Sequence, residues 1–503
     1  MTTIGRLVSY KIEFMWDDIN WYDETNYFIS ARGSFKSTPP GQSIMASGGI
    51  VNRMQVVMNN INGRFGPEPT SLGGVDLTGG KIYNKRVRFS VQIFSGGFVP
   101  IFYGIIKIPV CTTGTPKDGP KATFECRTME DILLQYQTSS PQYRFADNFS
   151  ATVDESENIR RILTDIGIDT GDMEFETGML KIPAVWLDNE SVLEEIWKIA
   201  AACGGRFYAN EYGKFVYENM TSWLFNGVGD KHYYPNGTID RSLYQSISVN
   251  YDDSNLYNDV RVEISPREFG QYGILWEPDE KLVVPANGSL TVTARFRQPA
   301  YYVTSITYQA ITTAGRNISG SITIDGWDTP DAQSVTLTFN NTNTLYAAHL
   351  EKLRIYGTPI VGSPTIEERR SSTTDFWNYR LPRVRALRSN LFIQTRAQAG
   401  SLAQFLLDTS LLPNFRVNIT GLIGDPDLHI GDKVQITDSG YTTGAGHVDA
   451  FVTGIDWKAD DKGFTQNVEL IGYDSVFQYQ KNEYLILDDS TYALLSNNQR
   501  VFY

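Results

Sequence analysis

The sequence has very few cysteine and histidine residues, and this excludes several kinds of fold and site. The 503 residues include three cysteines and four histidines. A disulfide-stapled domain needs an even set of cysteines, and a zinc site needs His or Cys at short, fixed spacings. Neither pattern occurs among Cys111, Cys126, Cys203, His232, His349, His429 and His447. We therefore expect no disulfide framework, no metal site and no cofactor.

The chain also lacks the motifs and segments that mark common enzymes and membrane proteins. It has no P-loop, no dinucleotide-binding G-x-G-x-x-G and no G-x-S-x-G nucleophile turn. The first residues, MTTIGRLVSYKIEF, show no basic stretch followed by an apolar run, so they do not form a signal peptide. No apolar run approaches the roughly 18 residues of a membrane span. We expect a protein that is made in a cytoplasm, does not insert into a membrane and is not an enzyme.

Charged residues are sparse and mostly acidic. They make up 20% of the chain, and 57 acidic against 44 basic residues give a net charge of −13. Negative charge repels phosphates, so non-specific binding of nucleic acid to the outer surface is disfavoured. This excess of acidic over basic residues suits a protein that must not adhere to DNA.

Aromatic and turn-forming residues are abundant. Aromatics reach 13% of the chain, with 28 Tyr and 26 Phe, and there are 43 Gly. Aromatic side chains favour strands, whereas Gly and Asn favour the turns between them. At roughly 150 residues per domain, the chain divides into three or four units. These features predict a mainly β protein with several units.

The first half of the chain predicts a β unit followed by a small α+β unit. Residues 1–143 contain alternating runs such as SYKIEFMW and KRVRFSVQIF between Gly-rich turns, which predicts a barrel or sandwich that residues 241–265 complete. Within residues 144–240, NIRRILTDIGI and SVLEEIWKIAAACGG each show an apolar stripe at helical spacing and end at Gly. RFYANEYGKFVYEN then predicts a β-hairpin.

The second half predicts two further β units. Residues 266–362 contain evenly spaced strands typical of a sandwich. Residues 363–475 hold a polar linker, a helix over 395–412 and a β unit. Within the last, the stretch 428–473 contains three alternating runs, 432–437, 450–457 and 464–473, which predict an antiparallel meander. Residues 476–503 form a C-terminal extension.

Three groups of acidic residues are candidates for sugar hydrolysis or calcium binding. The groups are Asp17, Asp18, Asp23 and Glu24; Asp252, Asp253 and Asp259; and Asp488 with Asp489. Asp is also common in turns, where it caps backbone N–H groups, and no calcium-loop pattern is present. We favour solvated turns for all three groups. The nearby aromatic residues Trp16, Trp21 and Tyr22, and the pair Tyr301 and Tyr302, could stack on sugars but more commonly serve packing.

One group of arginines stands out in the linker. It comprises Arg369, Arg370, Arg380, Arg383, Arg385 and Arg388. Such a group could contact DNA phosphates. Asp375, Phe376, Trp377 and Tyr379 interrupt it, and Arg with aromatics is typical of protein interfaces. We therefore favour a subunit interface over a DNA site.

Taken in order, these segments resemble a tail-tip or baseplate hub protein of a tailed, siphophage-like bacteriophage. The resemblance includes SYKIEFMWDDINWYDETNYF at the start and LDNESVLEEIWKIAAACGGRFYANEYGKFVYEN in the inserted α+β domain. It continues in LTFNNTNTLYAAHLEKLRIYGTPI, at the end of an accessory sandwich, and in TRAQAGSLAQFLLDTSLLPNFRVNITGLIGDPDLHIGDKVQIT. Each motif alone is weak, whereas their order spans nearly the whole chain.

The resemblance implies two tube-like β-barrel hub domains, residues 1–143 and 363–475, with an inserted α+β domain and an accessory β-sandwich. It implies a homotrimer whose six barrels match a sixfold distal tail protein ring. Such a hub closes the tail tube, meets the tape-measure protein, carries tail fibres or receptor-binding proteins, and passes DNA through its lumen. The protein would be located at the tail tip of the virion, and the accessory sandwich favours a non-contractile tail.

The alternative is a tail protein on a β scaffold that binds or degrades glycans. Its sugar site would be the acidic and aromatic cluster near the N-terminus, with two carboxylates facing each other across a groove. A secreted surface-layer protein is a third possibility, which the missing signal peptide disfavours.

Overall fold

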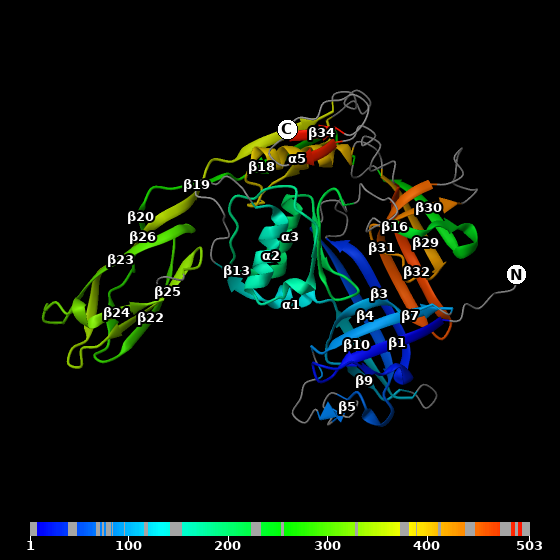
Figure 1. Ribbon diagram of the computed structural model, residues 1–503, viewed down its shortest axis with the longest axis horizontal. Helices are drawn as coiled ribbons and strands as arrows, with labels where there is room; N and C mark the ends of the chain where they lie inside the picture. Colours follow the sequence, from blue (N-terminus) through cyan, green and yellow to red (C-terminus); the bar gives the residue numbers. More distant parts are fainter. Residues whose placement is uncertain are drawn as a thin grey trace.

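The computed structural model describes most of the chain, and its fold is mainly β, as the sequence predicts (Figure 1). The described residues are 8–38, 48–66, 71–72, 75–76, 82, 84–94, 96–114, 119–140, 153–222, 233–252, 256–326, 330–372, 382–388, 390–410, 414–437, 448–472, 484–487 and 491–494. In these residues, no helix is long and apolar enough to cross a membrane.

The first β unit is an antiparallel sheet of six main strands that curls around an apolar core. The order across the sheet is β1 (Val8–Met15), β7 (Arg86–Ile93), β8 (Val99–Ile106), β10 (Lys121–Arg127), β4 (Gly48–Asn59) and β3 (Phe28–Thr38). Alternate side chains point inward, and Phe14 of β1 meets Phe124 of β10 with 5.4 Å between ring centroids. The short strands β2 (Tyr22–Asp23) and β9 (Val110–Thr112) pair with β1 and β10, while β5 (Ser71–Leu72) and β6 (Val75–Asp76) pair with each other in a separate sheet.

The second β unit also has six strands. Their order is β16 (Tyr233–Asp240), β30 (Lys433–Thr437), β31 (Val448–Asp460), β32 (Gly463–Gly472), β29 (Asn414–Ile423) and β17 (Ser246–Asp252). The meander predicted within 428–473 is confirmed as β30, β31 and β32, while residue 473 lies outside the described residues.

The prediction that residues 241–265 complete the first β unit is wrong. In the structure, β17 pairs with β29 along its whole length, so it belongs to the second unit. The following strand, β18 (Asp259–Ile264), lies between β27 (Ile366–Ser371) and β28 (Val384–Leu387) in a separate three-stranded sheet. An alternating apolar pattern specifies a buried face, but it does not specify which sheet supplies the partner strand.

The α+β unit contains the two predicted helices and the predicted hairpin. Its elements are α1 (Glu130–Gln135), β11 (Gln137–Ser139), α2 (Glu155–Asp165), β12 (Met173–Phe175), β13 (Asp188–Ser191), α3 (Val192–Ala202), β14 (Arg206–Ala209) and β15 (Phe215–Glu218). The apolar stripes of α2 and α3 are buried in one core. Helix α5 (Arg396–Asp408), which the sequence groups with the last β unit, buries its apolar side in this same core.

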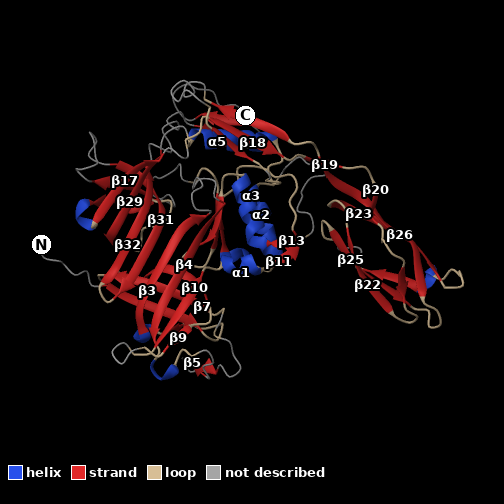
Figure 2. Cartoon of the chain, turned by 180° about the vertical axis from the view of Figure 1, so that it is seen from behind, coloured by secondary structure: helices blue, strands red, loops and turns tan. Residues whose placement is uncertain are grey.

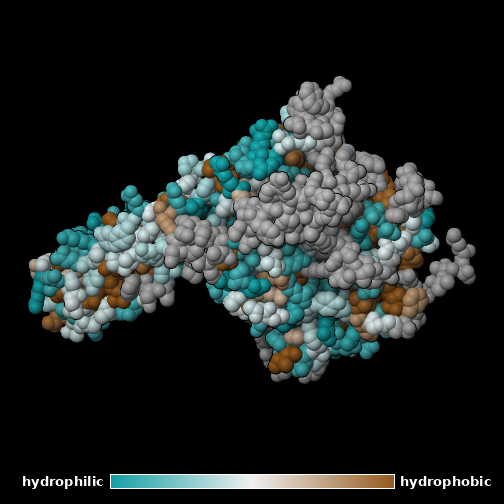
Figure 3. Space-filling model, turned by 45° about the horizontal axis from the view of Figure 1, so that its top comes forward, coloured by the Kyte–Doolittle hydropathy of each residue, from teal (hydrophilic) through white to brown (hydrophobic). Residues whose placement is uncertain are grey.

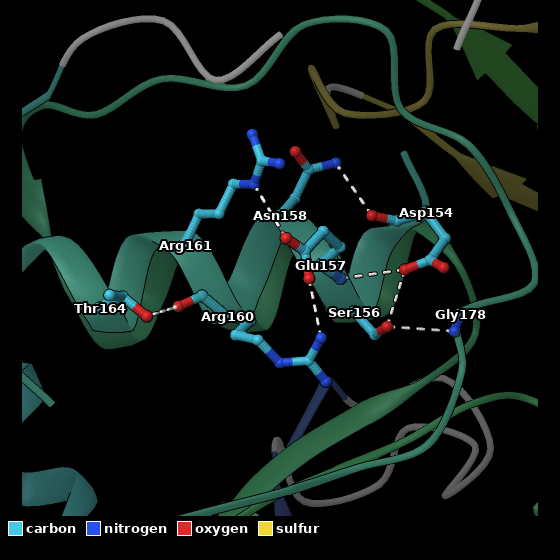
Figure 4. A network of polar contacts seen from close by, with 8 residues as sticks. All are labelled: Asp154, Ser156, Glu157, Asn158, Arg160, Arg161, Thr164 and Gly178. Carbon is cyan, nitrogen blue, oxygen red and sulfur yellow. Dashed lines mark hydrogen bonds and ion pairs between the residues drawn. The ribbon is translucent and has the colours of Figure 1, made fainter. Parts of the chain in front are cut away.

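The start of α2 is fixed by a network of polar contacts (Figure 4). Asp154 is the N-cap, and its carboxylate accepts a hydrogen bond from the backbone N–H of Glu157 at 2.9 Å. Ser156 donates to the same carboxylate at 2.7 Å and accepts from the N–H of Gly178 at 3.1 Å. Because side-chain oxygens satisfy N–H groups that the first helical turn leaves unpaired, this network sets where the helix begins.

The accessory β-sandwich forms an arm that projects from the rest of the molecule (Figure 1). One sheet centres on β26 (Ala348–Gly362), which pairs with β19 (Arg267–Phe269), β20 (Gly273–Trp276), β21 (Leu282–Val284) and β23 (Ala300–Ile311). The other sheet has the order β22 (Ser289–Arg295), β25 (Ser334–Asn341) and β24 (Ile322–Asp325). The two sheets enclose a separate apolar core, and hydrophobic residues on the outside of the arm lie in small patches among hydrophilic ones (Figure 3).

Of the predicted C-terminal extension, the structure describes only β33 (Tyr484–Leu487) and β34 (Thr491–Leu494). These two strands pair with each other in an antiparallel hairpin.

Candidate functional site at the junction of the two β units

The two β units join edge to edge in one continuous sheet (Figure 2). The joint is the antiparallel ladder between β3 and β31, whose six residue pairs run from Ala31 opposite Ala459 to Lys36 opposite Gly454. The same edge of β31 pairs with β30 through its first residues and with β3 through the later ones. Hydrogen bonding therefore passes without a break from one unit to the other.

A tryptophan from the second unit seals this joint. Trp457 lies opposite Gly33 in the ladder, is almost fully buried and stacks on Phe89 of the first unit, with 5.6 Å between ring centroids and 10° between ring planes. A Cβ atom on residue 33 would lie 2.3 Å from Cε2 of Trp457, closer than real contacts allow. The strand needs glycine here because the indole occupies the space above its backbone.

Opposite this core, the continuous sheet presents a polar face with a shallow groove. The groove has a volume of about 580 Å³ and crosses five strands, β10, β4, β3, β31 and β32. Its polar side chains alternate with those of the core, as expected for a sheet that is buried on one side. We call it the junction groove; its lining includes Arg32, Ser34, Arg53, Gln55, Glu125, Arg127, Asp456, Lys458, Thr465 and Asn467.

An ion-pair cluster extends the polar face next to the junction groove. Lys36 of β3 contacts Asp456 at 2.9 Å and Glu469 at 2.7 Å, so one cation bridges two strands of the second unit. Burial lowers the pKa of this lysine, but its hydrogen bonds and charge interactions with both carboxylates outweigh burial and raise it. The cluster ties the two units together at the surface, although partly exposed ion pairs contribute little to stability.

A second joint holds the α+β unit against the β units. Trp197 of α3 packs over Gly49 of β4 and donates a hydrogen bond to the carbonyl of Phe207 at 3.1 Å. In the hairpin between β14 and β15, Glu211 lies 3.4 Å from Nε2 of His429, which belongs to the second β unit. Burial lowers the pKa of His429, but the hydrogen bond and charge of Glu211, together with Asp432 and Asp427, raise it to about 9. The imidazole is therefore charged at neutral pH and pairs with Glu211.

Glu155 and Glu130 are two of the buried glutamates of the α+β unit. Glu155 accepts hydrogen bonds from the N–H of Met179 at 2.9 Å, the N–H of Leu180 at 2.8 Å and the hydroxyl of Tyr217 at 2.9 Å. Burial nevertheless raises the pKa of Glu155 to about 7 and that of Glu130 to about 8. The bonds to Glu155 connect α2 with the segment before β13 and with β15, which is a structural role.

The acidic and aromatic cluster near the N-terminus is occupied by internal contacts. Trp16 is buried and donates to Glu24 at 3.1 Å, and Glu24 also pairs with Arg64 at 2.8 Å. Asp17 accepts from the N–H of Ile19, from Asn20 and from Tyr22, while Asp23 accepts from the N–H of Thr25. These bonds, above all the one from the backbone N–H of Asn20, lower the pKa of Asp17.

Trp21, and the pair Tyr301 and Tyr302, also make contacts within the protein. The guanidinium of Arg88 lies 4.4 Å from the ring centre of Trp21, and Tyr103 meets the same ring edge to face at 5.7 Å. On the arm, Tyr301 packs between Phe269 and Tyr302, with ring centroids 4.1 Å and 4.9 Å apart. Internal packing is thus an observed use of both aromatic groups.

The other acidic groups are separated by the fold. Asp259 is buried and pairs with Arg261 at 3.1 Å and Arg369 at 2.8 Å. Asp252 lies in β17, in a different sheet, while Asp253, Asp488 and Asp489 lie outside the described residues.

The arginine group of the linker lies partly on the sheet of β18, β27 and β28. Arg369 pairs with Asp259, Arg370 with Glu368 at 2.5 Å, and Arg385 lies 5.8 Å from the ring centre of Tyr257. Arg383 and Arg388 are exposed, whereas Arg380 and the interrupting residues Asp375, Phe376, Trp377 and Tyr379 lie outside the described residues.

The cysteines and histidines are dispersed. All three cysteines are free thiols, and Cys126 and Cys203 are buried. His349 contacts the hydroxyl of Thr313 at 3.2 Å, while His232 and His447 are not among the described residues. Within the described ranges, no three His, Cys, Asp or Glu side chains gather in a group that could hold a metal ion.

Comparison with known proteins gives distant structural likenesses. No protein-family model and no curated protein matches the sequence. The structure is similar to a tail protein from Neisseria meningitidis, with 11% identity over 93% of this chain and 98% of that chain and a TM-score of 0.46. It is also similar to a prophage tail protein from Shewanella oneidensis, with 10% identity over 93% of this chain and 100% of that one and a TM-score of 0.46.

A third similar structure comes from a bacterial secretion system. It is a component of the Escherichia coli type VI secretion system, described as similar to T4 bacteriophage tail proteins, with 9% identity over 89% of this chain and 74% of that one and a TM-score of 0.37. Phage tail proteins, the class that the sequence resembles, are thus also among the solved structures to which the fold is similar. With TM-scores below 0.5, these likenesses are too distant to assign a role to any residue.

Proposed function

We propose that this chain is a structural virion protein that forms a homotrimeric hub at the tip of a phage tail. The observation that carries the proposal is the β3–β31 ladder, which joins two six-stranded β units edge to edge in one sheet. Three copies of such a block place six β units around an axis. A trimer of this kind can adapt a sixfold tail tube to a threefold tip.

The two faces of the joined sheet suit the wall of a channel. One face is a continuous apolar core shared by both units, and the other presents the junction groove and the Lys36 cluster to solvent. A wall around an aqueous lumen needs this division, because the lumen side must stay hydrated while the opposite side packs against protein. In the proposed hub, this polar face lines the passage through which DNA leaves the tail.

The proposed hub has no catalytic role. Its partners are the distal tail protein ring above it, the tape-measure protein in its lumen, and tail fibres or receptor-binding proteins outside it. The arm is the element positioned to reach outward, because its sandwich has a core of its own and projects from the body of the molecule (Figure 1). Assembly would take place in the host cytoplasm, before the tail joins the virion.

Electron microscopy of the purified chain tests the proposal. We expect threefold ring particles with a central passage, and a mass by light scattering of three times 56.6 kDa. A matched sample of Gly33→Ala, in which the β3–β31 ladder is weakened, should contain fewer rings. A monomer at every concentration, both alone and mixed with the tail proteins expressed alongside it, would contradict the trimeric hub.

The glycan-binding alternative has a separate test. A glycan array or a hydrolysis assay with the same purified protein should show no signal above background. A signal that disappears in Asp17→Asn, with the fold intact, would favour the alternative instead.

A further inference from the structure

Two pairs of like charges face each other across the strands of the junction groove. Arg53 of β4 is directly opposite Arg127 of β10, and Arg32 of β3 is directly opposite Lys458 of β31. Directly opposite side chains in an antiparallel pair are close enough to interact, and like charges there destabilise the sheet. The continuous sheet thus gathers four cations on one face, in a chain whose net charge is −13.

Within the described part of the chain, two of these cations have carboxylate partners and two do not. Arg127 is held by Asp131 at 2.6 Å, and Lys458 by Asp460 at 2.6 Å. Among the residues that the structure describes, Arg32 donates a hydrogen bond to the amide oxygen of Gln55, at 3.0 Å, and has no ion pair. Arg53 forms no hydrogen bond or ion pair with any residue that the structure describes, and both Arg32 and Arg53 are exposed.

The register places these two arginines as a diagonal pair. Arg53 is opposite Ser34, and Arg32 is opposite Gln55, so the arginines lie two positions apart on neighbouring strands and point to the same face. Such diagonal neighbours are roughly 7–8 Å apart. In an extended peptide, residues i and i+2 lie on one side and are about 6.6 Å apart, which matches that spacing. Each guanidinium presents a fork of N–H donors that fits a carboxylate.

From this arrangement we infer that the junction groove binds an acidic segment of another polypeptide, whose carboxylates at alternating positions pair with Arg32 and Arg53. The carboxylates of the ligand would neutralise the charges that the sheet leaves unpaired. Such binding needs only one copy of the chain and does not depend on a ring of three copies.

The surroundings favour a peptide over DNA. Glu125 and Asp456 also line the groove, where they pair with Lys107 at 3.6 Å and Lys36 at 2.9 Å, and their negative charge offsets part of the attraction that the face would have for continuous phosphates. A peptide can place its carboxylates selectively and offer backbone N–H groups to these acids. The groove volume of about 580 Å³ lies in the range of sites for small ligands and short segments.

Fluorescence anisotropy with a labelled peptide of alternating Glu and Gly, at low salt, tests the inference on the full chain. We expect saturable binding that weakens by about tenfold or more in Arg53→Gln and in Arg32→Gln, because each loses a charge-assisted contact. Arg354→Gln is the matched control. It removes one exposed arginine on the arm, where Arg354 pairs with Glu277 at 3.2 Å, and should change binding less than twofold.

A stability measurement separates lost binding from lost folding. Arg53→Gln removes the repulsion with Arg127, so its melting temperature should equal or exceed that of the wild type. Unchanged peptide binding in both groove variants would overturn the inference. Stronger competition by a DNA duplex of equal charge than by the unlabelled peptide would also overturn it and indicate a nucleic-acid site.

Discussion

Substitution of Gly33 by Ala should weaken the joint between the two β units. The added Cβ would lie 2.3 Å from Cε2 and 2.4 Å from Cζ2 of Trp457, so the indole or the β3 backbone must move. The indole has little room, because Phe89 stacks on it at 5.6 Å and Phe464 lies at 6.2 Å. Overpacking of a well-filled core costs about 1–3 kcal/mol. We expect a loss of about 2 kcal/mol or more in the free energy of unfolding.

Urea unfolding followed by circular dichroism measures this loss, since a change in stability lowers the midpoint and leaves the slope unchanged. Peptide-level hydrogen exchange should localise the effect to residues 31–36 and 454–459, the two sides of the ladder. Gly454→Ala is the matched control in the same ladder. The three atoms nearest to its Cβ all belong to Glu469, with Oε2 at 3.3 Å and Cβ at 3.5 Å, so a small shift of the exposed carboxylate relieves the contact and we expect a change within about 0.5 kcal/mol.

A double-mutant cycle with Trp457→Ala completes the test. That truncation alone removes a buried indole and should cost about 3–5 kcal/mol. Since the alanine at residue 33 no longer clashes once the indole is gone, the double variant should be more stable than the sum of the single losses predicts. Additive losses, or equal stability of Gly33→Ala and Gly454→Ala, would refute the role of Trp457 as the element that seals the joint.

Three further predictions concern single side chains. The folded pKa of His429 is raised to about 9, so its pairing with Glu211 stabilises the fold fully below pH 6.5. This stabilisation is lost as the pH rises through 9. The melting temperature of His429→Gln should therefore differ most from that of the wild type at pH 6.5 and least at pH 10. Burial raises the folded pKa of Glu155 to about 7, so stability should fall as the pH rises from 4.5 through 7, and melts of Glu155→Gln should lack this fall. Trp16→Phe leaves the buried Glu24 without one donor and should cost about 1–3 kcal/mol in urea unfolding; a loss of glycan binding without a loss of stability would point to a sugar site instead.

The sequence predicts the local elements of this chain well, because their patterns are short and repeat at fixed periods. The alternation of Val434 and Ile436 with polar residues predicts β30, and the stripe of Ile159, Ile162 and Leu163 predicts α2. Both patterns report which side of an element is buried. Neither pattern identifies the partner strand, and for this reason the sequence predicts the wrong β unit for β17.

The candidate site was less accessible to sequence reasoning, because it is formed by residues more than 400 positions apart. Nothing in the run around Gly33 names Trp457 as its partner. One local signal was present: a glycine inside a strand pattern indicates a close approach by another group. The acidic and aromatic cluster at Trp16 shows that composition can also suggest a site that the fold does not form. The burial of Trp16 and its hydrogen bond to Glu24 depend on tertiary packing, which composition does not specify.

The joint inside the chain also bears on how copies could meet. A ring of identical chains uses heterologous contacts, in which two different surfaces meet at every joint between chains. The block of two β units has such different ends, since β1 and β2 border the first unit while β16 and β17 border the second. A proposed ring of three blocks would therefore alternate two kinds of joint, the internal β3–β31 ladder and a contact between unlike ends. The six β units of such a ring would have similar shapes, but two different sets of surface residues would alternate around it. An adapter between sixfold and threefold assemblies requires this property.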